Sequence, residues 1–218
     1  MRIADNMRNV AVTEGDKVEA QIKFGWEVDA YPVNEIAAVV QDVKPGDVEA
    51  LVEEYYSKYQ ILLEGRDEAE FRKHVAVQAQ IELGFEKFLE EQNYQAIVTH
   101  FGDLGSLQQL PGLAIQRLME KGYGFGGEGD WKTAAMVRVM KIMTQGMKDA
   151  KGTSFMEDYT YNLVPGKKES FRHICLRFAR QSQMVRSASS VSHCLWEIVK
   201  IQLVLYLQQK KDRQSQHH

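Results

Sequence analysis

The chain has 218 residues, of which 44% are hydrophobic and 26% charged, and its formal net charge is −3. This length can bury a substantial core, and this composition excludes a wholly disordered chain. The small net charge gives no electrostatic reason to expect nucleic acid as a partner.

The first fifth of the chain contains two stretches with the composition of strands and one with that of a helix. Asn9 to Thr13 is short and β-branched, and Gln21 to Val28 alternates polar with apolar residues, so both predict strands. Asn34 to Val43 predicts a helix, with Asn34 as its N-cap. Because the first predicted element is a strand without a leader, we expect an earlier domain to be absent.

The middle of the chain predicts two helices followed by a strand. Pro45 starts a helix that runs to about Leu62. Asp67 to Gln92 predicts a long charged helix with apolar residues at helical spacing on one face. That face carries Phe71, Val75, Ile81, Phe85 and Leu89. Ala96 to Phe101 predicts a strand that ends in a polar loop.

The next part predicts two further helices on either side of a glycine-rich loop. Gly112 to Lys121 and Asp130 to Met147 are the helices, and Gly122 to Gly129 is the loop. Thr153 to Phe155 and Tyr159 to Val164 predict strands. Because helices and strands alternate, the predicted fold class is α/β, with a largely parallel open sheet flanked by helices.

Targeting and redox features are weak. Met1 to Ala20 lacks the apolar run of a signal peptide, and no run reaches the roughly 18 apolar residues that span a bilayer. Two cysteines, Cys175 and Cys194, do not make a disulfide framework. We therefore expect a cytoplasmic protein without a membrane partner.

A compositional break lies near Glu169. Residues 1–169 carry 19 basic and 28 acidic residues, whereas residues 170–218 carry 8 basic and 2 acidic ones. All 16 glycines and all 4 prolines lie before residue 170, so the tail lacks the usual chemistry of turns and helix stops. We expect the tail to be irregular or helical; Leu195 to Gln209 is rich in helix formers.

The glycine-rich loop is the densest signal for chemistry. Gly122, Gly124 and Gly127 fit the spacing G-x-G-x-x-G, but a predicted helix precedes them where a dinucleotide fingerprint needs a strand. A flexible connection between helices is the simpler alternative. Against it stands Glu128, which lies among small residues just before a helix that Asp130 is expected to cap.

A second acidic candidate is Glu157, between two predicted strands. A Glu157–Asp158 pair at a strand end is often only a solvated turn. Glu128 and Glu157 lie on separate elements, and they could converge on a divalent metal or form an acid/base pair. Spacing alone leaves these alternatives open.

Two other side-chain patterns have simpler structural explanations. Four methionines on one predicted helical face are interpreted as core filling rather than a cofactor site. They are Met136, Met140, Met143 and Met147. His74 on the charged helix is predicted to lie at the surface, and His100 follows a strand end, where ligand contacts are common in open α/β sheets.

Four long motifs resemble L-arabinose isomerases. They are GYGFGGEGDWKTA (122–134), GTSFMEDYTY (152–161), DNMRNVAVTEGDKVEAQIKFG (5–25) and LPGLAIQRLMEKGYGF (110–125). The resemblance covers about residues 2–169. It implies a fucose-isomerase-like fold with two α/β domains followed by a β-rich domain, of which residues 1–150 would be the central α/β domain and 151–169 the start of the β-rich one.

The resemblance also implies a site. The family interconverts L-arabinose and L-ribulose with a divalent metal, typically Mn(II), and forms homo-oligomers. Glu128 and Glu157 match its two metal-binding glutamates, which are also its acid/base pair. Met7 and Phe101 match positions that line the sugar site, Met7 as an apolar wall and Phe101 as a flat surface for the sugar's C–H face.

The tail departs from the family pattern. The family needs two histidine ligands beyond Glu157, the first opening a segment like His-Met-Leu-Glu-Val-Cys-Pro-Thr-Ile-Ala-Asp-Gly. Codons that encode Ile174 to Val185 can encode that segment when the frame starts one nucleotide earlier, within the codon of His173. We therefore interpret residues 170–218 as an out-of-frame tail without a native fold. The functional expectation is an L-arabinose isomerase by descent; the alternative is an inactive fragment that lacks the N-terminal domain and the histidine ligands.

Overall fold

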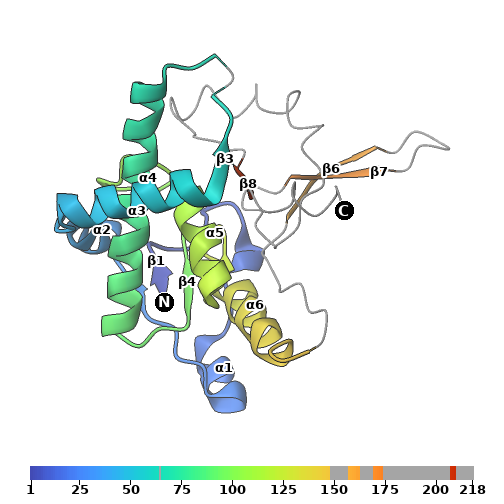
Figure 1. Ribbon diagram of the computed structural model, residues 1–218. Helices are drawn as coiled ribbons and strands as arrows, with labels where there is room; N and C mark the ends of the chain where they lie inside the picture. Colours follow the sequence, from blue (N-terminus) through green and yellow to red (C-terminus); the bar gives the residue numbers. More distant parts are fainter. Residues whose placement is uncertain (64, 148–156, 163–168, 174–206, 210–218) are drawn as a thin grey trace.

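The computed structural model describes residues 1–63, 65–147, 157–162, 169–173 and 207–209, with a four-stranded sheet at the centre (Figure 1). The strands of this sheet are β1 (Arg2–Ile3), β2 (Ala30–Tyr31), β4 (Ala96–Val98) and β5 (Gly124–Gly126). They lie in the order β2-β1-β4-β5 and every pair is parallel. The predicted fold class, α/β with a parallel sheet flanked by helices, is confirmed.

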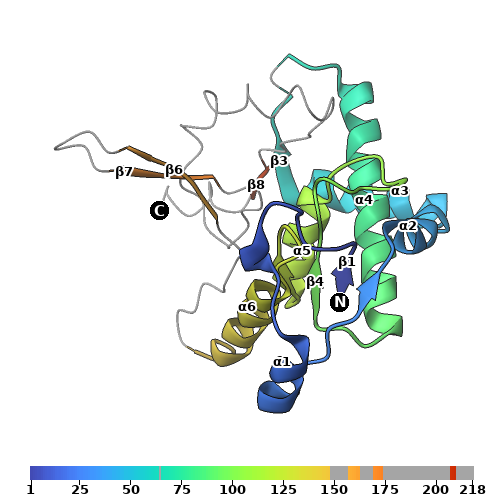
Figure 2. The same ribbon diagram turned by 180° about the vertical axis from the view of Figure 1, so that it is seen from behind.

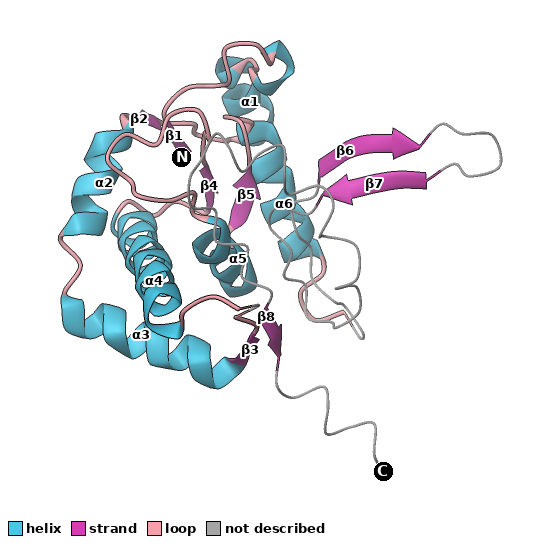
Figure 3. Cartoon of the chain, turned by 90° about the horizontal axis from the view of Figure 1, so that it is seen from above, coloured by secondary structure: helices cyan, strands magenta, loops and turns pink. Residues whose placement is uncertain are grey.

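Helices cover both faces of the sheet, and Figure 3 shows the three layers from above. One face is covered by α2 (Val33–Gln41), α4 (Glu68–Glu91) and α5 (Gly112–Lys121), and the other by α1 (Lys17–Phe24) and α6 (Trp131–Met143). Neighbouring strand residues point to opposite faces. In β4, Ile97 therefore joins the core under α2, α4 and α5, while Val98 packs with Trp131 and Ala20 under α6 and α1.

A second apolar cluster joins α3 (Pro45–Lys58) to α4. Val52, Tyr55 and Phe71 are buried in it. After α3 the chain forms β3 (Tyr59–Ile61), which pairs antiparallel with β8 (Leu207–Gln209). The predicted helix from Pro45 to Leu62 therefore ends earlier, at Lys58.

Both strands predicted before residue 30 are wrong. The first stretch contains a 3-10 helix, η1 (Ala11–Thr13), and the first half of the second, up to Phe24, lies in α1. The Asp16 side chain accepts a hydrogen bond from the Glu19 N–H, and Gly25 ends α1 at a φ of 69°. These two caps outweigh the alternating pattern that begins at Gln21. Ala20 is the residue of α1 that is buried.

The long helices were easier to predict than their ends. The periodic segments from Asp67 to Gln92 and Gly112 to Lys121 correspond to α4 and α5. Asn34 is not the cap of α2, which begins at Val33 after Pro32; its side chain instead accepts a hydrogen bond from the Ser106 N–H.

The four methionines predicted as core filling are exposed by 48–71%, so that prediction is wrong. The buried face of α6 is formed by Trp131, Ala134 and Val137. At about 100° per residue, Met136, Met140 and Met143 lie on the opposite side of α6, and Met147 lies beyond its end. Figure 2 shows α6 beside α1, which also exposes apolar side chains, Val18 and Ile22.

After α6 the described chain consists of three strands. β6 (Glu157–Asn162) and β7 (Glu169–His173) form an antiparallel ribbon, which agrees with a strand predicted near Tyr159. The strand predicted from Thr153 to Phe155 lies outside the described residues. Of the segment from Leu195 to Gln209, the last three residues form β8 rather than helix, and the rest lies outside the described residues.

In the described part, helices long and apolar enough to cross a membrane are absent.

Candidate functional site

The candidate site lies where the parallel strands end. β1 is hydrogen-bonded to β2 on one side and to β4 on the other, so the order of connections reverses between β1 and β4. Open α/β sheets bind ligands outside the carboxyl ends of their strands at such a point. The loops that follow β1, β4 and β5 carry Met7, Phe101 and Glu128, so three of the four predicted site residues share this edge.

Glu128 forms the turn between β5 and α6. Its φ of 56° is left-handed, which costs energy for a residue other than glycine. Its carbonyl accepts a hydrogen bond from the Met7 N–H at 3.1 Å, so the first and third loops touch directly. Among the described residues no hydrogen bond or ion pair occupies its half-buried carboxylate.

The helix after this turn is capped as predicted. The Asp130 carboxylate accepts hydrogen bonds from the backbone N–H groups of Lys132 and Thr133, both at 3.1 Å. Two donors at the start of α6 are thereby satisfied, and the end of the Glu128 turn is fixed.

Two glycines of this loop, Gly124 and Gly126, allow α6 to pack closely on β5. A Cβ at Gly124 would lie 2.1 Å from the Ala134 carbonyl oxygen, and one at Gly126 would lie 2.3 Å from that of Asp130. α6 therefore rests directly on the backbone of β5. Gly129, with a φ of 83°, comes equally close to the backbone of Asn6. Gly124, Gly126 and Gly129 therefore each have a packing role within the chain.

Phe101 and His100 follow β4. Phe101 is 44% exposed, so its ring is available to a ligand. His100 is turned back on its own loop, where Nδ1 accepts a hydrogen bond from the Gly102 N–H at 3.0 Å. His74, predicted at the surface, is half-buried, and its Nδ1 lies 3.2 Å from Nε2 of Gln109.

Glu157 is the predicted site residue that the described structure does not join to the others. It begins β6, and its cross-strand partner in β7 is His173. Within the described ranges, no group of three or more histidine, cysteine or acidic side chains is placed to hold a metal ion. A site of Glu128 and Glu157 together remains a prediction.

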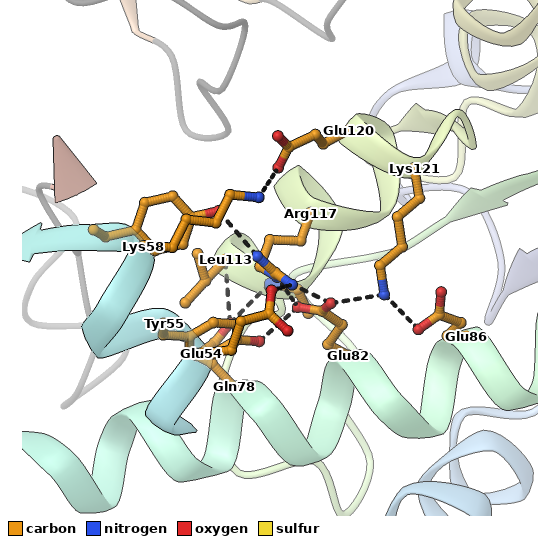
Figure 4. Close-up of polar contacts among 12 residues, drawn as sticks. Glu54, Tyr55, Lys58, Gln78, Glu82, Glu86, Leu113, Arg117, Glu120 and Lys121 are labelled. Carbon is orange, nitrogen blue, oxygen red and sulfur yellow. Dashed lines mark hydrogen bonds and ion pairs between the residues drawn. The ribbon is translucent and has the colours of Figure 1, made fainter. Parts of the chain in front are cut away.

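A charged cluster away from this edge was missed by the sequence analysis (Figure 4). Glu82 of α4 is fully buried and accepts hydrogen bonds from Arg117 and Tyr55. Lys121 pairs with the same carboxylate at 3.0 Å, and Arg117 also pairs with Glu54 at 2.6 Å. Each charge has an internal partner, so the cluster holds α3, α4 and α5 together rather than offering a ligand site.

Comparison with known families decides the ancestry of the chain. The family model of the L-arabinose isomerase central domain matches residues 1–146. The chain belongs to the L-arabinose isomerase family. The resemblance of its motifs is thereby confirmed, and the matched segment ends just after α6.

Curated L-arabinose isomerases are similar over about three quarters of the chain. The enzyme of Geobacillus stearothermophilus is 55% identical over 167 residues, which are 77% of this chain and 33% of the relative. That of Serratia proteamaculans is 53% identical over 165 residues, 76% of this chain and 32% of the relative. That of Yersinia pseudotuberculosis serotype O:1b is 54% identical over 165 residues, which are 76% of this chain and 33% of the relative. The chain thus spans about a third of the length of these isomerases.

The backbone of Glu128 gives a first testable prediction. Glu128→Gly should be more stable than Glu128→Ala by about 1 kcal/mol, because glycine adopts a left-handed φ without a Cβ penalty. Urea unfolding followed by circular dichroism measures the difference. The same two substitutions at Glu91, in the last turn of α4, should show the opposite order. Equal stability of the two Glu128 variants would contradict a strained turn.

Proposed function

We propose that this chain contributes the central-domain residues of an L-arabinose isomerase active site, which interconverts L-arabinose and L-ribulose. The observation that carries the proposal is the meeting of Met7, Phe101 and Glu128 on three loops at the reversal point of the sheet. Curated relatives named L-arabinose isomerase support the same reaction. We also propose, from the family, a cytoplasmic location and homo-oligomers of the complete enzyme.

The reaction needs a base beside a sugar carbon. Aldose–ketose isomerisation moves a proton between C1 and C2, commonly through a cis-enediol. A carboxylate held at a loop end can accept the C2 proton, and among the described residues no hydrogen bond or ion pair occupies that of Glu128. Glu157 is proposed as its partner for proton transfer at the sugar oxygens. Phe101 presents an exposed ring to the C–H face of the sugar, and Met7 forms an apolar wall.

The proposed centre includes a divalent metal, Mn(II) or a similar ion. Carboxylate oxygens are ligands of the type that Mn(II) takes, and the carboxylate of Glu128, which has no partner among the described residues, fits one ligand position. Glu128 and Glu157 would hold the ion. When bound, it polarises the sugar oxygens and stabilises negative charge that develops on them.

Glu128→Gln tests this function. We expect the purified chain to bind Mn(II), measured from the electron paramagnetic resonance signal of the free ion, and to form ketose from L-arabinose. Glu128→Gln should weaken Mn(II) binding by about tenfold or more and abolish ketose formation, since a carboxamide neither pairs with the cation nor accepts the proton. Glu91→Gln, at an exposed carboxylate of α4, is the matched control and should match the parent. Equal Mn(II) binding by parent and Glu128→Gln would overturn the proposal.

The second candidate is an inactive fragment. Among the described residues of the loops after β1, β4 and β5, Glu128 supplies the carboxylate of the predicted site, and Met7 and Phe101 supply no metal ligand of that kind. Such a fragment would bind Mn(II) weakly through Glu128 and produce no ketose. Ketose formation that Glu128→Gln abolishes would exclude it.

A further inference from the structure

Lys132 reaches from α6 to the loop that follows β1. It lies in the first turn of α6, four residues after Glu128. Its Nζ donates to the Val12 carbonyl at 2.9 Å and to the Glu14 carbonyl, and lies 3.5 Å from Oδ1 of Asp130. An ammonium group has three N–H donors, and two of them here bind the backbone of a single loop, with Asp130 within ion-pair distance.

The far end of that loop packs tightly on the same turn of α6. A Cβ at Gly15 would lie 2.7 Å from the Trp131 ring and 3.0 Å from Cδ of Lys132. The near end touches the Glu128 turn through the hydrogen bond from the Met7 N–H and the close approach of Gly129 to Asn6. The loop is therefore attached to the β5–α6 turn at both of its ends.

A second cation holds the loop from the sheet side. The Arg2 side chain is 7% exposed and pairs with Asp5 at 2.7 Å and with Glu14 at 3.5 Å. Its partners lie on both sides of the segment that contains Met7 and η1. Lys132 is thus the side chain that fixes the second half of this loop to α6, and with it the position of η1 behind Met7.

We propose that Lys132 is a positioning residue, which holds the Met7 loop against the Glu128 turn. The inference rests on the proposed function, because it assigns Met7 to the sugar wall and Glu128 to the metal and the proton transfer. In this role Lys132 acts through its hydrogen bonds to the Val12 and Glu14 carbonyls and not through contact with the sugar. Its loss lets the wall move away from the carboxylate, so sugar affinity falls while the affinity of Glu128 for the metal is kept.

Amide hydrogen exchange tests the mechanical part. In Lys132→Met we expect the amides of Met7, Val10 and Thr13 to exchange about 10-fold faster or more, because two charge-assisted hydrogen bonds to the loop are lost. The amides of α4 should keep their parental rates. Lys132→Arg should restore slow exchange in part, since a guanidinium can also donate to two carbonyls. Lys73→Met, at an exposed lysine of α4, is the matched control.

Ligand binding tests the functional part. For Lys132→Met we expect the Kd for L-arabinose to rise about 10-fold and the Kd for Mn(II) to stay within about twofold of the parent. Lys132→Arg should recover sugar affinity. Unchanged loop exchange, faster exchange throughout the chain, or equal weakening of sugar and metal would each overturn the role of Lys132. Faster loop exchange with unchanged sugar affinity would overturn it while leaving the proposed function intact. If the parent chain binds neither L-arabinose nor Mn(II), the proposed function is overturned, and with it the positioning role of Lys132.

Discussion

Replacing Arg117 with methionine is expected to destabilise the protein by about 3–5 kcal/mol, because it leaves the buried Glu82 carboxylate without its main counter-ion. Glu82 is fully buried, and both of its oxygens accept hydrogen bonds from Arg117 Nε, at 3.0 and 2.8 Å. Burial alone would lower the pKa of Arg117, but the facing Glu82 raises it above its ordinary value. The guanidinium therefore stays charged opposite Glu82, since arginine is already protonated at its ordinary pKa.

A double variant separates the cost of an unpaired charge from the value of the pair. Glu82→Met combined with Arg117→Met removes both buried charges, so it should be more stable than Arg117→Met alone. Burial and Glu82 raise the pKa of Tyr55, whose hydroxyl stays protonated and donates to Glu82 at 2.5 Å in the parent. Urea unfolding of the parent, Arg117→Met, Glu82→Met and the double variant gives the coupling energy directly.

Arg72 provides the surface control. It pairs with Glu49 and Glu53, which are both mostly exposed, so Arg72→Met should cost about 1 kcal/mol or less. Similar losses for Arg72→Met and Arg117→Met would contradict the assignment of the cluster as a buried tie between α3, α4 and α5.

Periodicity predicted the parts of the fold in which many residues share one face. α4 has ten buried residues at helical spacing, and the sequence located it within a residue or two at each end. β1 and β2 have two residues each, too few to form a pattern. β5 was hidden for another reason: it is made of two glycines and one phenylalanine, the composition of a loop. The conformation of β5 depends on its contacts with β4 and α6, and a local sequence pattern holds no information about such contacts.

The sequence identified an acidic candidate residue for the site, but not the residues that hold the site in place. Glu128 was visible because an acidic residue among glycines is unusual in a plain connection. Lys132 could not be recognised, since a lysine in the first turn of a helix is ordinary and its acceptors lie 118 and 120 positions away along the chain. Glu82 and Arg117, 35 positions apart, were equally invisible. Each of these residues gains its role only when the helices pack.

Gly126→Ala is expected to destabilise the protein by about 3 kcal/mol or more and to displace the Glu128 turn. A Cβ there would lie 2.3 Å from the Asp130 carbonyl oxygen, and neither β5 nor the capped first turn of α6 can move without breaking its hydrogen bonds. Gly124→Ala should behave alike, because its Cβ would lie 2.1 Å from the Ala134 carbonyl oxygen. Thermal and urea unfolding measure the loss.

Gly46→Ala is the control for the substitution itself. Gly46 lies in α3 with no atom within 4 Å of the added Cβ, so alanine there should be neutral or stabilising by up to about 1 kcal/mol. Parental stability of Gly126→Ala would contradict the contact between β5 and α6.

Mn(II) binding then distinguishes this contact from the buried charge cluster. We expect both Gly126→Ala and Arg117→Met to lower stability, but only Gly126→Ala to change the position of Glu128. Glu128 lies two residues after Gly126, at the start of the turn into α6. At a temperature where each variant is still folded, Gly126→Ala should therefore bind Mn(II) about tenfold more weakly than the parent, and Arg117→Met should bind it as the parent does. Equal affinities in both variants would mean that the packing of α6 on β5 does not set the position of the Glu128 carboxylate.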